Sequence, residues 1–363
     1  MKRIALLGLM LFAALGISSH ALAQAGGQSS LWQKIEPGGD TVCAHGTPYA
    51  FWTHEGISNN LLVYFEGGGG CWNADTCRDT GAEFNGFYDS RIGSADAPYL
   101  RGGMLDLSRA ENPFHDYSIV YVPSCTGDVH WGDNVYTYED AEEGDVTIHF
   151  NGFVNAQAAL AWAYQHIPAP ESVFVSGCSA GSVGSIVHAP YIIEHYAGIN
   201  AAIPVYQLGD SLSLLFTRPV NLQTDWHAHD NFPQWIPELA SMQPLDWTMA
   251  KYYQAIASYY PDDTFSQFNS IQDSVQVFYT FPDDDGDGAD WENLLEAHLA
   301  IITAPNYHAL TAGGTLHCLT PRPQFYTYAI DGVPVRDWVE DLASGRAVES
   351  LHCRNCELVD LVD

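Results

Sequence analysis

The chain has 363 residues, of which 44 are acidic and 13 are lysine or arginine, so its formal net charge at pH 7 is −31. This excess of negative charge argues against nucleic acid as a partner, and at low ionic strength it opposes binding of a highly charged, unesterified pectin. We interpret the acidic residues mainly as a solvated surface that keeps the protein soluble in saline surroundings.

The N-terminus has the layout of a secretory signal peptide. Lys2 and Arg3 precede an apolar stretch over residues 4–17, and a small-x-small cleavage site follows at residues 21–23. We therefore expect residues 1–23 to be removed, leaving residues 24–363 as a single catalytic domain of a monomeric, secreted or periplasmic protein. No later apolar stretch reaches the length of about 18 residues that a membrane span requires, so no membrane span is expected.

The cysteines indicate an oxidising compartment. All eight lie after residue 23, and an even count in an exported protein favours disulfides over free thiols or zinc sites. Cys71 and Cys77 are close enough to close a small loop, and so are Cys353 and Cys356. The second pair has the spacing of a redox dithiol, but no βαβ pattern precedes it, so we expect a structural bridge there.

Short apolar runs predict the strands of a parallel sheet. They cover residues 61–65, 118–122 and 172–176, and a further run covers residues 201–206. Apolar side chains recur at helical spacing over residues 153–167, between the second and third runs. This strand–helix–strand order predicts an α/β fold, with an α/β-hydrolase-like, mostly parallel sheet and flanking helices.

Residues 177–181 read Gly-Cys-Ser-Ala-Gly, a G-x-S-x-G motif that directly follows the third apolar run. In this position the motif is typical of a nucleophile elbow, in which Ser179 lies on a sharp turn and the glycines allow close contact between strand and helix. We expect the following helix over residues 180–189, with Pro190 stopping or bending it. The alternative is an ordinary glycine-rich turn. Strand, turn and helix together favour a serine hydrolase, with Ala180 as one oxyanion donor.

Two further segments carry candidate functional residues. Residues 216–262 are rich in tryptophan, tyrosine and proline and are predicted to form a lid insertion, in which Trp226, Trp235 and Trp247 line the substrate pocket or simply pack on the body. Later in the chain, Asp283, Asp285 and Asp287 match the first half of a calcium loop. The twelfth position holds a leucine, so we expect either a looser structural calcium site or a solvated acidic turn.

Several motifs together resemble the pectin acetylesterase family, which includes the carboxylesterase Notum. The matching segments are residues 66–71 with Cys77, 112–114, 122–128, 177–181, 273–276 and 317–318. The resemblance spans most of the expected mature chain. It implies a catalytic triad of Ser179, Asp273 and His317, with oxyanion donors from the backbone of Gly68, Gly69 and Ala180, and it implies no required cofactor.

The order of these residues along the chain agrees with the implied triad, because serine, acid and histidine is the order in α/β-hydrolases. The segment before Asp273 is neither cleanly alternating nor apolar, so Asp210 stays as a second choice for the acid. His298 and His308 are alternative bases, and the match at His317 favours that residue. A disulfide between the cysteines at 178 and 318 would then hold nucleophile and base in register.

Three classes of function fit these observations. The leading hypothesis is a secreted serine esterase that removes acetyl groups from a plant or algal polysaccharide such as pectin. The alternative is a general carboxylesterase or lipid deacylase that acts on longer acyl esters. The third is a non-catalytic, calcium-dependent binding protein on a hydrolase scaffold, which a fold alone does not exclude. The expected partner is an acetylated polysaccharide or a small ester.

Overall fold

The computed structural model describes residues 31–354 except for 95, 201, 212, 216–222, 245 and 282–285. The expected signal peptide and Cys356 therefore lie outside the described residues. Within the described ranges, no helix has the length and apolar character that crossing a bilayer requires.

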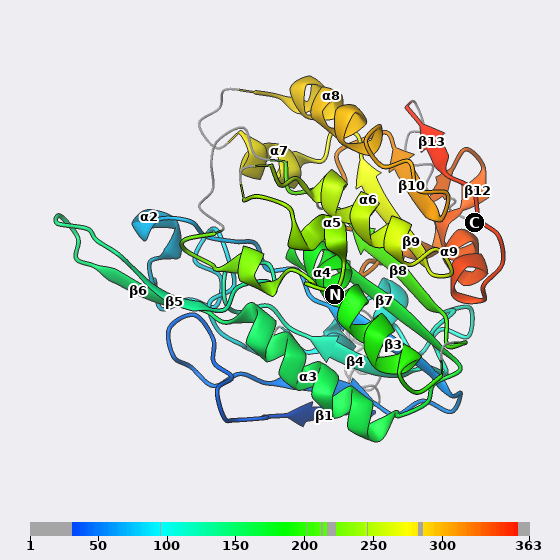
Figure 1. Ribbon diagram of the computed structural model, residues 1–363, viewed down its shortest axis with the longest axis horizontal. Helices are drawn as coiled ribbons and strands as arrows, with labels where there is room; N and C mark the ends of the chain where they lie inside the picture. The colour runs from blue at the N-terminus through cyan, green and yellow to red at the C-terminus, as the bar shows by residue number, and fades with distance from the viewer. Residues whose placement is uncertain are drawn as a thin grey trace, which may run out of the picture.

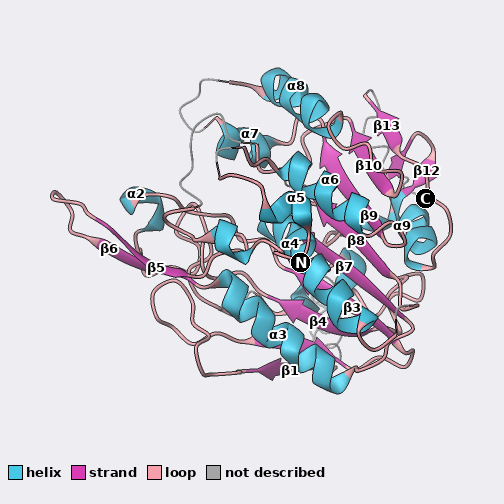
Figure 2. Ribbon diagram, in the orientation of Figure 1, coloured by secondary structure: helices cyan, strands magenta, loops and turns pink. Residues whose placement is uncertain are grey.

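A nine-stranded sheet forms the centre of the molecule (Figures 1 and 2). Neighbours from β4 to β13 run parallel, and β2 joins β1 and β4 in antiparallel pairs. In spatial order the strands are β1 (Trp32–Ile35), β2 (Phe51–His54), β4 (Ser118–Val122), β3 (Asn60–Phe65), β7 (Ser172–Cys178), β8 (Val205–Asp210), β9 (Thr264–Ser270), β10 (Tyr307–Ala312) and β13 (Leu351–Cys353). The predicted mostly parallel sheet is confirmed.

Helices cover both faces of the sheet because alternate strand residues point to opposite sides. In β3, Leu61 and Val63 belong to one core, whereas Leu62 and Tyr64 belong to the other. The first core packs against α3 (Gly152–His166), α4 (Ala180–Ala197), α5 (Pro237–Ala240) and α6 (Met249–Tyr259), and the second packs against α9 (Val335–Ala343). The predicted flanking helices are therefore present.

The remaining α-helices and strands belong neither to the central sheet nor to the helices named above. They are α2 (Ala74–Cys77), α7 (Ser274–Thr280), α8 (Gly288–Leu299), the short strands β11 (Ala329–Ile330) and β12 (Val333–Pro334), and the hairpin of β5 (Asn134–Tyr138) and β6 (Val146–Phe150). The hairpin projects from the body next to α2 (Figure 1). Helix α8 forms a small core of its own around Trp291.

Two predicted boundaries were wrong. The helix after Ser179 does not stop at Pro190 but continues to Ala197, because buried Ile192 and Ile193 pack its second half into the core and offset the hydrogen bond that proline removes. The run at residues 201–206 becomes a strand only from Val205, and that strand continues to Asp210. The residues before it form a turn in which the Asn200 carbonyl accepts the Ile203 N–H at 3.1 Å.

The segment before Asp273 is a strand in spite of its polar composition. Strand β9 is buried over Phe265–Ser270, and its polar side chains find partners inside the sheet. Ser266 Oγ donates to the Gln207 carbonyl at 2.6 Å, and Gln267 Oε1 accepts from the Tyr307 hydroxyl at 2.7 Å. Because these bonds satisfy most of the buried polar groups, a central strand can carry polar residues that periodicity does not identify, although Gln267 Nε2 and Ser270 Oγ have no hydrogen-bond partner among the described residues.

Three disulfides join described cysteines. Cys71–Cys77 and Cys178–Cys318 are present as expected. The third, Cys43–Cys125, was not predicted and links residues 82 positions apart in the sequence. The expected partner of Cys353 is Cys356, which lies outside the described residues.

Candidate active site

Ser179 lies on a strained turn between β7 and α4. Its backbone angles are φ 55° and ψ −124°, a conformation that residues with a side chain rarely adopt and that costs on the order of 1–3 kcal/mol. The flanking glycines make the turn sterically possible, because a Cβ at Gly177 would lie 2.2 Å from the Gly181 carbonyl oxygen, and one at Gly181 would lie 2.0 Å from the Phe65 oxygen. The local geometry is therefore that of a nucleophile elbow.

Asp273 and His317 are in direct contact. Asp273 follows β9 and caps α7, where its Oδ1 accepts the N–H groups of Val275 and Gln276 at 3.0 Å each. Its buried carboxylate lies 2.9 Å from His317 Nδ1, measured to Oδ2. A proton on Nδ1 is held by this carboxylate, so Nε2 is left as the atom that can accept a proton. Ser179 and His317 line the same cavity.

Asp210, the second choice for the acid, has a different role. Its Oδ2 accepts the N–H groups of Leu319 and Thr320 at 2.7 and 2.6 Å, and the Thr320 hydroxyl at 2.7 Å. Its Oδ1 accepts from Ser211 Oγ at 2.8 Å. The carboxylate is fully buried, and it holds the loop that follows His317 rather than the imidazole itself.

The alternative bases are also placed elsewhere. His298 lies on α8 and is buried against Gln267, and burial lowers its pKa to about 4. His308 lies on β10, where burial lowers its pKa as well. Neither residue lines the cavity that holds Ser179. The structure thus brings together Ser179, Asp273 and His317 and leaves out the other candidates.

The Ser179 cavity has a volume of about 400 Å³, and the glycine loop after β3 forms one of its walls. Gly67 packs directly on Ser179, since a Cβ there would lie 3.0 Å from Ser179 Cβ. Among the hydrogen bonds of the described residues, none uses the N–H of Gly68, Gly69 or Ala180. These three predicted oxyanion donors therefore remain available to an external acceptor.

The cavity wall also carries ionisable side chains that the sequence analysis did not select. Glu66, next to the glycine loop, is buried and bonded to Arg101. Burial raises the pKa of Glu66 to about 8 although Arg101 opposes the shift, and burial, helped by Asp96, raises the pKa of Asp89 to about 7. Asp89 and Arg101 lie within residues 78–111, where the sequence analysis found no motif, so no sequence signal identified them.

The described part of the predicted lid does not reach the Ser179 cavity. Trp226 is buried and donates its indole N–H to the Cys71 carbonyl at 3.2 Å, and Trp247 packs edge-on against Trp131. Trp235 is 36% exposed and donates to the Tyr260 hydroxyl at 2.6 Å. Of the two interpretations for these three tryptophans, packing on the body is the one that the structure supports.

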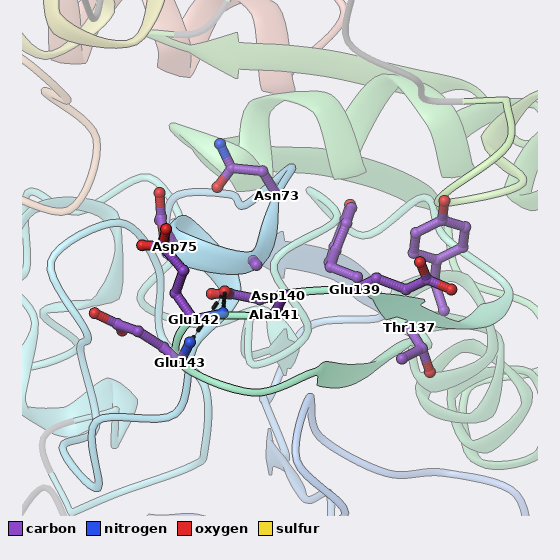
Figure 3. A pocket seen from close by; sticks show the side chains of 11 residues that line it. Asn73, Asp75, Thr137, Glu139, Asp140, Ala141, Glu142 and Glu143 are labelled. Atoms are coloured by element: carbon purple, nitrogen blue, oxygen red, sulfur yellow. Dashed lines mark hydrogen bonds between the residues drawn. The ribbon is translucent and has the colours of Figure 1, made fainter.

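A larger cavity of about 760 Å³ lies between α2 and the β5–β6 hairpin (Figure 3). Its wall is acidic, with Asp75, Glu139, Glu142 and Glu143, and Asp140 accepts the N–H groups of the last two residues. No member of the Ser–Asp–His group lines it. It is therefore separate from the candidate active site.

The acidic sequence proposed for calcium is only partly described. Asp283 and Asp285 lie outside the described residues. Asp287 is the N-cap of α8, where its Oδ1 accepts the N–H groups of Ala289 and Asp290 at 2.8 and 3.1 Å. Within the described ranges, no group of three or more histidine, cysteine or acidic side chains has the arrangement of a metal site.

Comparisons with known proteins place the chain among esterases. It is 26% identical to Pectin acetylesterase 4 of Arabidopsis thaliana over 167 residues, and 25% identical to Palmitoleoyl-protein carboxylesterase NOTUM of Schmidtea mediterranea over 150 residues. These alignments cover 42% and 40% of this chain. They span only 37% and 27% of the respective relatives.

The fold is similar to that of the Wnt deacylase Notum from Drosophila, with a TM-score of 0.62 over 86% of this chain and 93% of that one, at 17% sequence identity. The sequence profile of the pectinacetylesterases matches residues 34–270, a segment that contains the glycine loop and the elbow and ends just before Asp273. The chain is therefore a member of the pectinacetylesterase family.

Proposed function

We propose that this protein is a secreted serine esterase in which Ser179 is the nucleophile, His317 the general base and Asp273 the residue that orients His317. The observation that carries the proposal is that His317, in contact with Asp273, lines the same cavity as Ser179, which is held on a strained elbow. Three disulfides support an oxidising, extracytoplasmic location.

In the proposed reaction, Ser179 Oγ attacks the ester carbonyl while His317 Nε2 takes its proton. The N–H groups of Gly68, Gly69 and Ala180 then stabilise the negative oxygen of the tetrahedral intermediate. The imidazolium returns the proton to the leaving alcohol, and an acyl-Ser179 ester remains. Water, deprotonated by the same imidazole, hydrolyses that ester and releases the carboxylic acid.

The substrate that we propose is an acetylated polysaccharide such as pectin or xylan. The similarity to Pectin acetylesterase 4 supports this class, and so does the polar wall of the cavity, which includes Glu66, Asp89 and Arg101. A long-chain acyl ester is the second candidate, because the fold is similar to that of the Wnt deacylase Notum over most of the chain.

The test is acetate release from acetylated pectin and acetylated xylan in moderate salt, which screens the repulsion between an acidic protein and a polyanion. Release by the wild type and not by Ser179→Ala would support both the nucleophile and the deacetylase function. If neither protein releases acetate, the polysaccharide assignment fails, and a chain-length series of 4-nitrophenyl esters then tests the longer-acyl candidate. Failure on every ester would leave only a binding function.

A further inference from the structure

Asp89 presents an unused carboxylate beside the candidate oxyanion loop. Its backbone N–H donates to the Gly68 carbonyl at 2.8 Å, which fixes its segment against the loop. A Cβ built on Gly68 would lie 2.9 Å from Asp89 Oδ2, so the carboxylate lies directly over that glycine, and it lines the Ser179 cavity. Among the described residues, no hydrogen bond or ion pair reaches this carboxylate.

Arg101 presents unused donors in the same cavity. Its Nη2 is bonded to Glu66 and lies 3.9 Å from Asp96 Oδ1. A guanidinium has five N–H groups in a planar fork, and the hydrogen bonds of Arg101 to Glu66 and Tyr121 leave further N–H groups without a partner among the described residues. The side chain is 36% exposed and lines the cavity. Acceptors on Asp89 and donors on Arg101 therefore line the same space close to Ser179.

We propose that Asp89 and Arg101 form a subsite that binds the hydroxyl groups of a saccharide ring on the alcohol side of the ester, and that Asp89 determines the preference for such alcohols. The proposal rests on the proposed function and adds the residues that select the leaving group. We call Asp89 and Arg101 the hydroxyl subsite. A sugar hydroxyl donates to Asp89 and accepts from Arg101, so vicinal hydroxyls match both groups.

An aliphatic chain does not match the hydroxyl subsite. It would remove water from a carboxylate and a guanidinium without replacing their hydrogen bonds. Burying a polar group without a hydrogen-bond partner is unfavourable in free energy. The raised pKa of Asp89 fits a carboxyl group that burial has deprived of partners. Tyr279 and Phe84, the latter 52% exposed, add aromatic faces to the same cavity, against which the apolar face of a sugar ring can pack.

The experiment compares two esters that share the acetyl group and differ in the alcohol. One is an acetylated oligosaccharide of pectin or xylan, and the other is 4-nitrophenyl acetate, whose alcohol has no further hydroxyl. For Asp89→Leu, the kcat/KM on the oligosaccharide is expected to fall about tenfold more than on 4-nitrophenyl acetate, the loss typical of one hydrogen bond to a charged group. Asp89→Asn, which keeps one acceptor oxygen, should show a smaller selective loss.

The matched control is Asp96→Asn. Asp96 also lies near Arg101 and is buried, but it does not line the cavity. The substitution changes the local charge without removing a substrate contact, and the interaction of Asp96 with Arg101 does not depend on the alcohol. The ratio of kcat/KM on the oligosaccharide to kcat/KM on 4-nitrophenyl acetate should therefore change less than about twofold. The hydroxyl subsite would be refuted if the Asp89 variants lost kcat/KM equally on both esters. It would also be refuted if Asp96→Asn changed the ratio of the two kcat/KM values as much as the Asp89 variants do.

A binding measurement tests the hydroxyl subsite without an acetylated saccharide substrate. Deacetylated oligosaccharides should inhibit 4-nitrophenyl acetate hydrolysis by the wild type, with an inhibition constant about tenfold higher in Asp89→Leu. Equal inhibition of both proteins would contradict the subsite. If Ser179-dependent hydrolysis of 4-nitrophenyl acetate is present without these selective effects, only the subsite is refuted. If Ser179→Ala hydrolyses this ester as well as the wild type, the proposed function fails and the subsite fails with it.

Discussion

The disulfide between Cys178 and Cys318 joins the residue that precedes Ser179 to the residue that follows His317. The two cysteines are 140 positions apart in the sequence, and their Cα atoms lie 5.6 Å apart. Cys178 ends β7 inside the sheet, so the bridge ties the loop that carries His317 to a rigid strand. A loop fixed in this way keeps the imidazole in the cavity of Ser179 without a helix or strand of its own.

Removing this bridge should lower both stability and turnover. We expect Cys178→Ser with Cys318→Ser to reduce the free energy of unfolding by about 2–5 kcal/mol and to lower kcat even at temperatures where the protein stays folded. Urea unfolding and ester hydrolysis at low temperature measure the two effects. Cys43→Ser with Cys125→Ser is the control, since neither cysteine is adjacent to Ser179 or His317 in the sequence. If kcat fell as far in the Cys43→Ser, Cys125→Ser control, the Cys178–Cys318 bridge would have no specific role in positioning His317.

Substitutions in the proposed triad should have graded effects. Ser179→Ala and His317→Ala should remove nearly all esterase activity, whereas Asp273→Asn should lose on the order of 10³–10⁴-fold in kcat. An asparagine can still cap α7 through its oxygen, but its NH₂ group would face His317 Nδ1 and favour the wrong tautomer. Initial rates on 4-nitrophenyl acetate give the comparison, and an active Ser179→Ala enzyme would refute the mechanism.

Asp210 should prove to be a positioning residue. Asp210→Ala leaves the N–H groups of Leu319 and Thr320 buried without their acceptor, which should cost about 3–5 kcal/mol in the free energy of unfolding. Because this loop follows His317, kcat should fall while KM changes little. Asp225→Ala, which removes a buried carboxylate that accepts from the Tyr138 hydroxyl at 2.9 Å, is the control and should affect stability alone. A change in KM without one in kcat would contradict the assignment.

The contribution of Asp89 and Glu66 to the stability of the protein should fall as the pH rises from about 4 to 8. Burial raises the pKa of Asp89 from 3.8 to about 7 and that of Glu66 from 4.5 to about 8. Between the ordinary and the raised pKa of each group, the carboxyl is still protonated in the folded state but ionised in the unfolded state. The stability that each group contributes therefore decreases with increasing pH. Calorimetric melting of the wild type and of Asp89→Asn from pH 4 to 9 measures the contribution of Asp89, and the stability of the wild type relative to Asp89→Asn should decline over this interval. A wild-type midpoint that rises relative to that of Asp89→Asn would contradict the raised pKa of Asp89.

The local motifs of the sequence predicted a large part of the fold and the elbow that holds Ser179. The apolar runs at residues 61–65, 118–122 and 172–176 are strands of the observed parallel sheet, and the strand, turn and helix around Ser179 are present. These features could be predicted because they depend on neighbouring residues: hydrophobic periodicity within one element, and the small side chains that a sharp turn requires.

Only the tertiary structure determined which residues that are far apart in the sequence come into contact. It placed Asp273, and not Asp210, against His317, and it packed the described tryptophans of the expected lid on the body. It also brought Asp89 and Arg101 to the glycine loop from a segment without a motif. In the sequence, an aspartate that orients a histidine cannot be distinguished from an aspartate that holds a loop in place. Its role depends on partners far along the chain, and only the packing of the sheet and its loops brings those partners within hydrogen-bond distance.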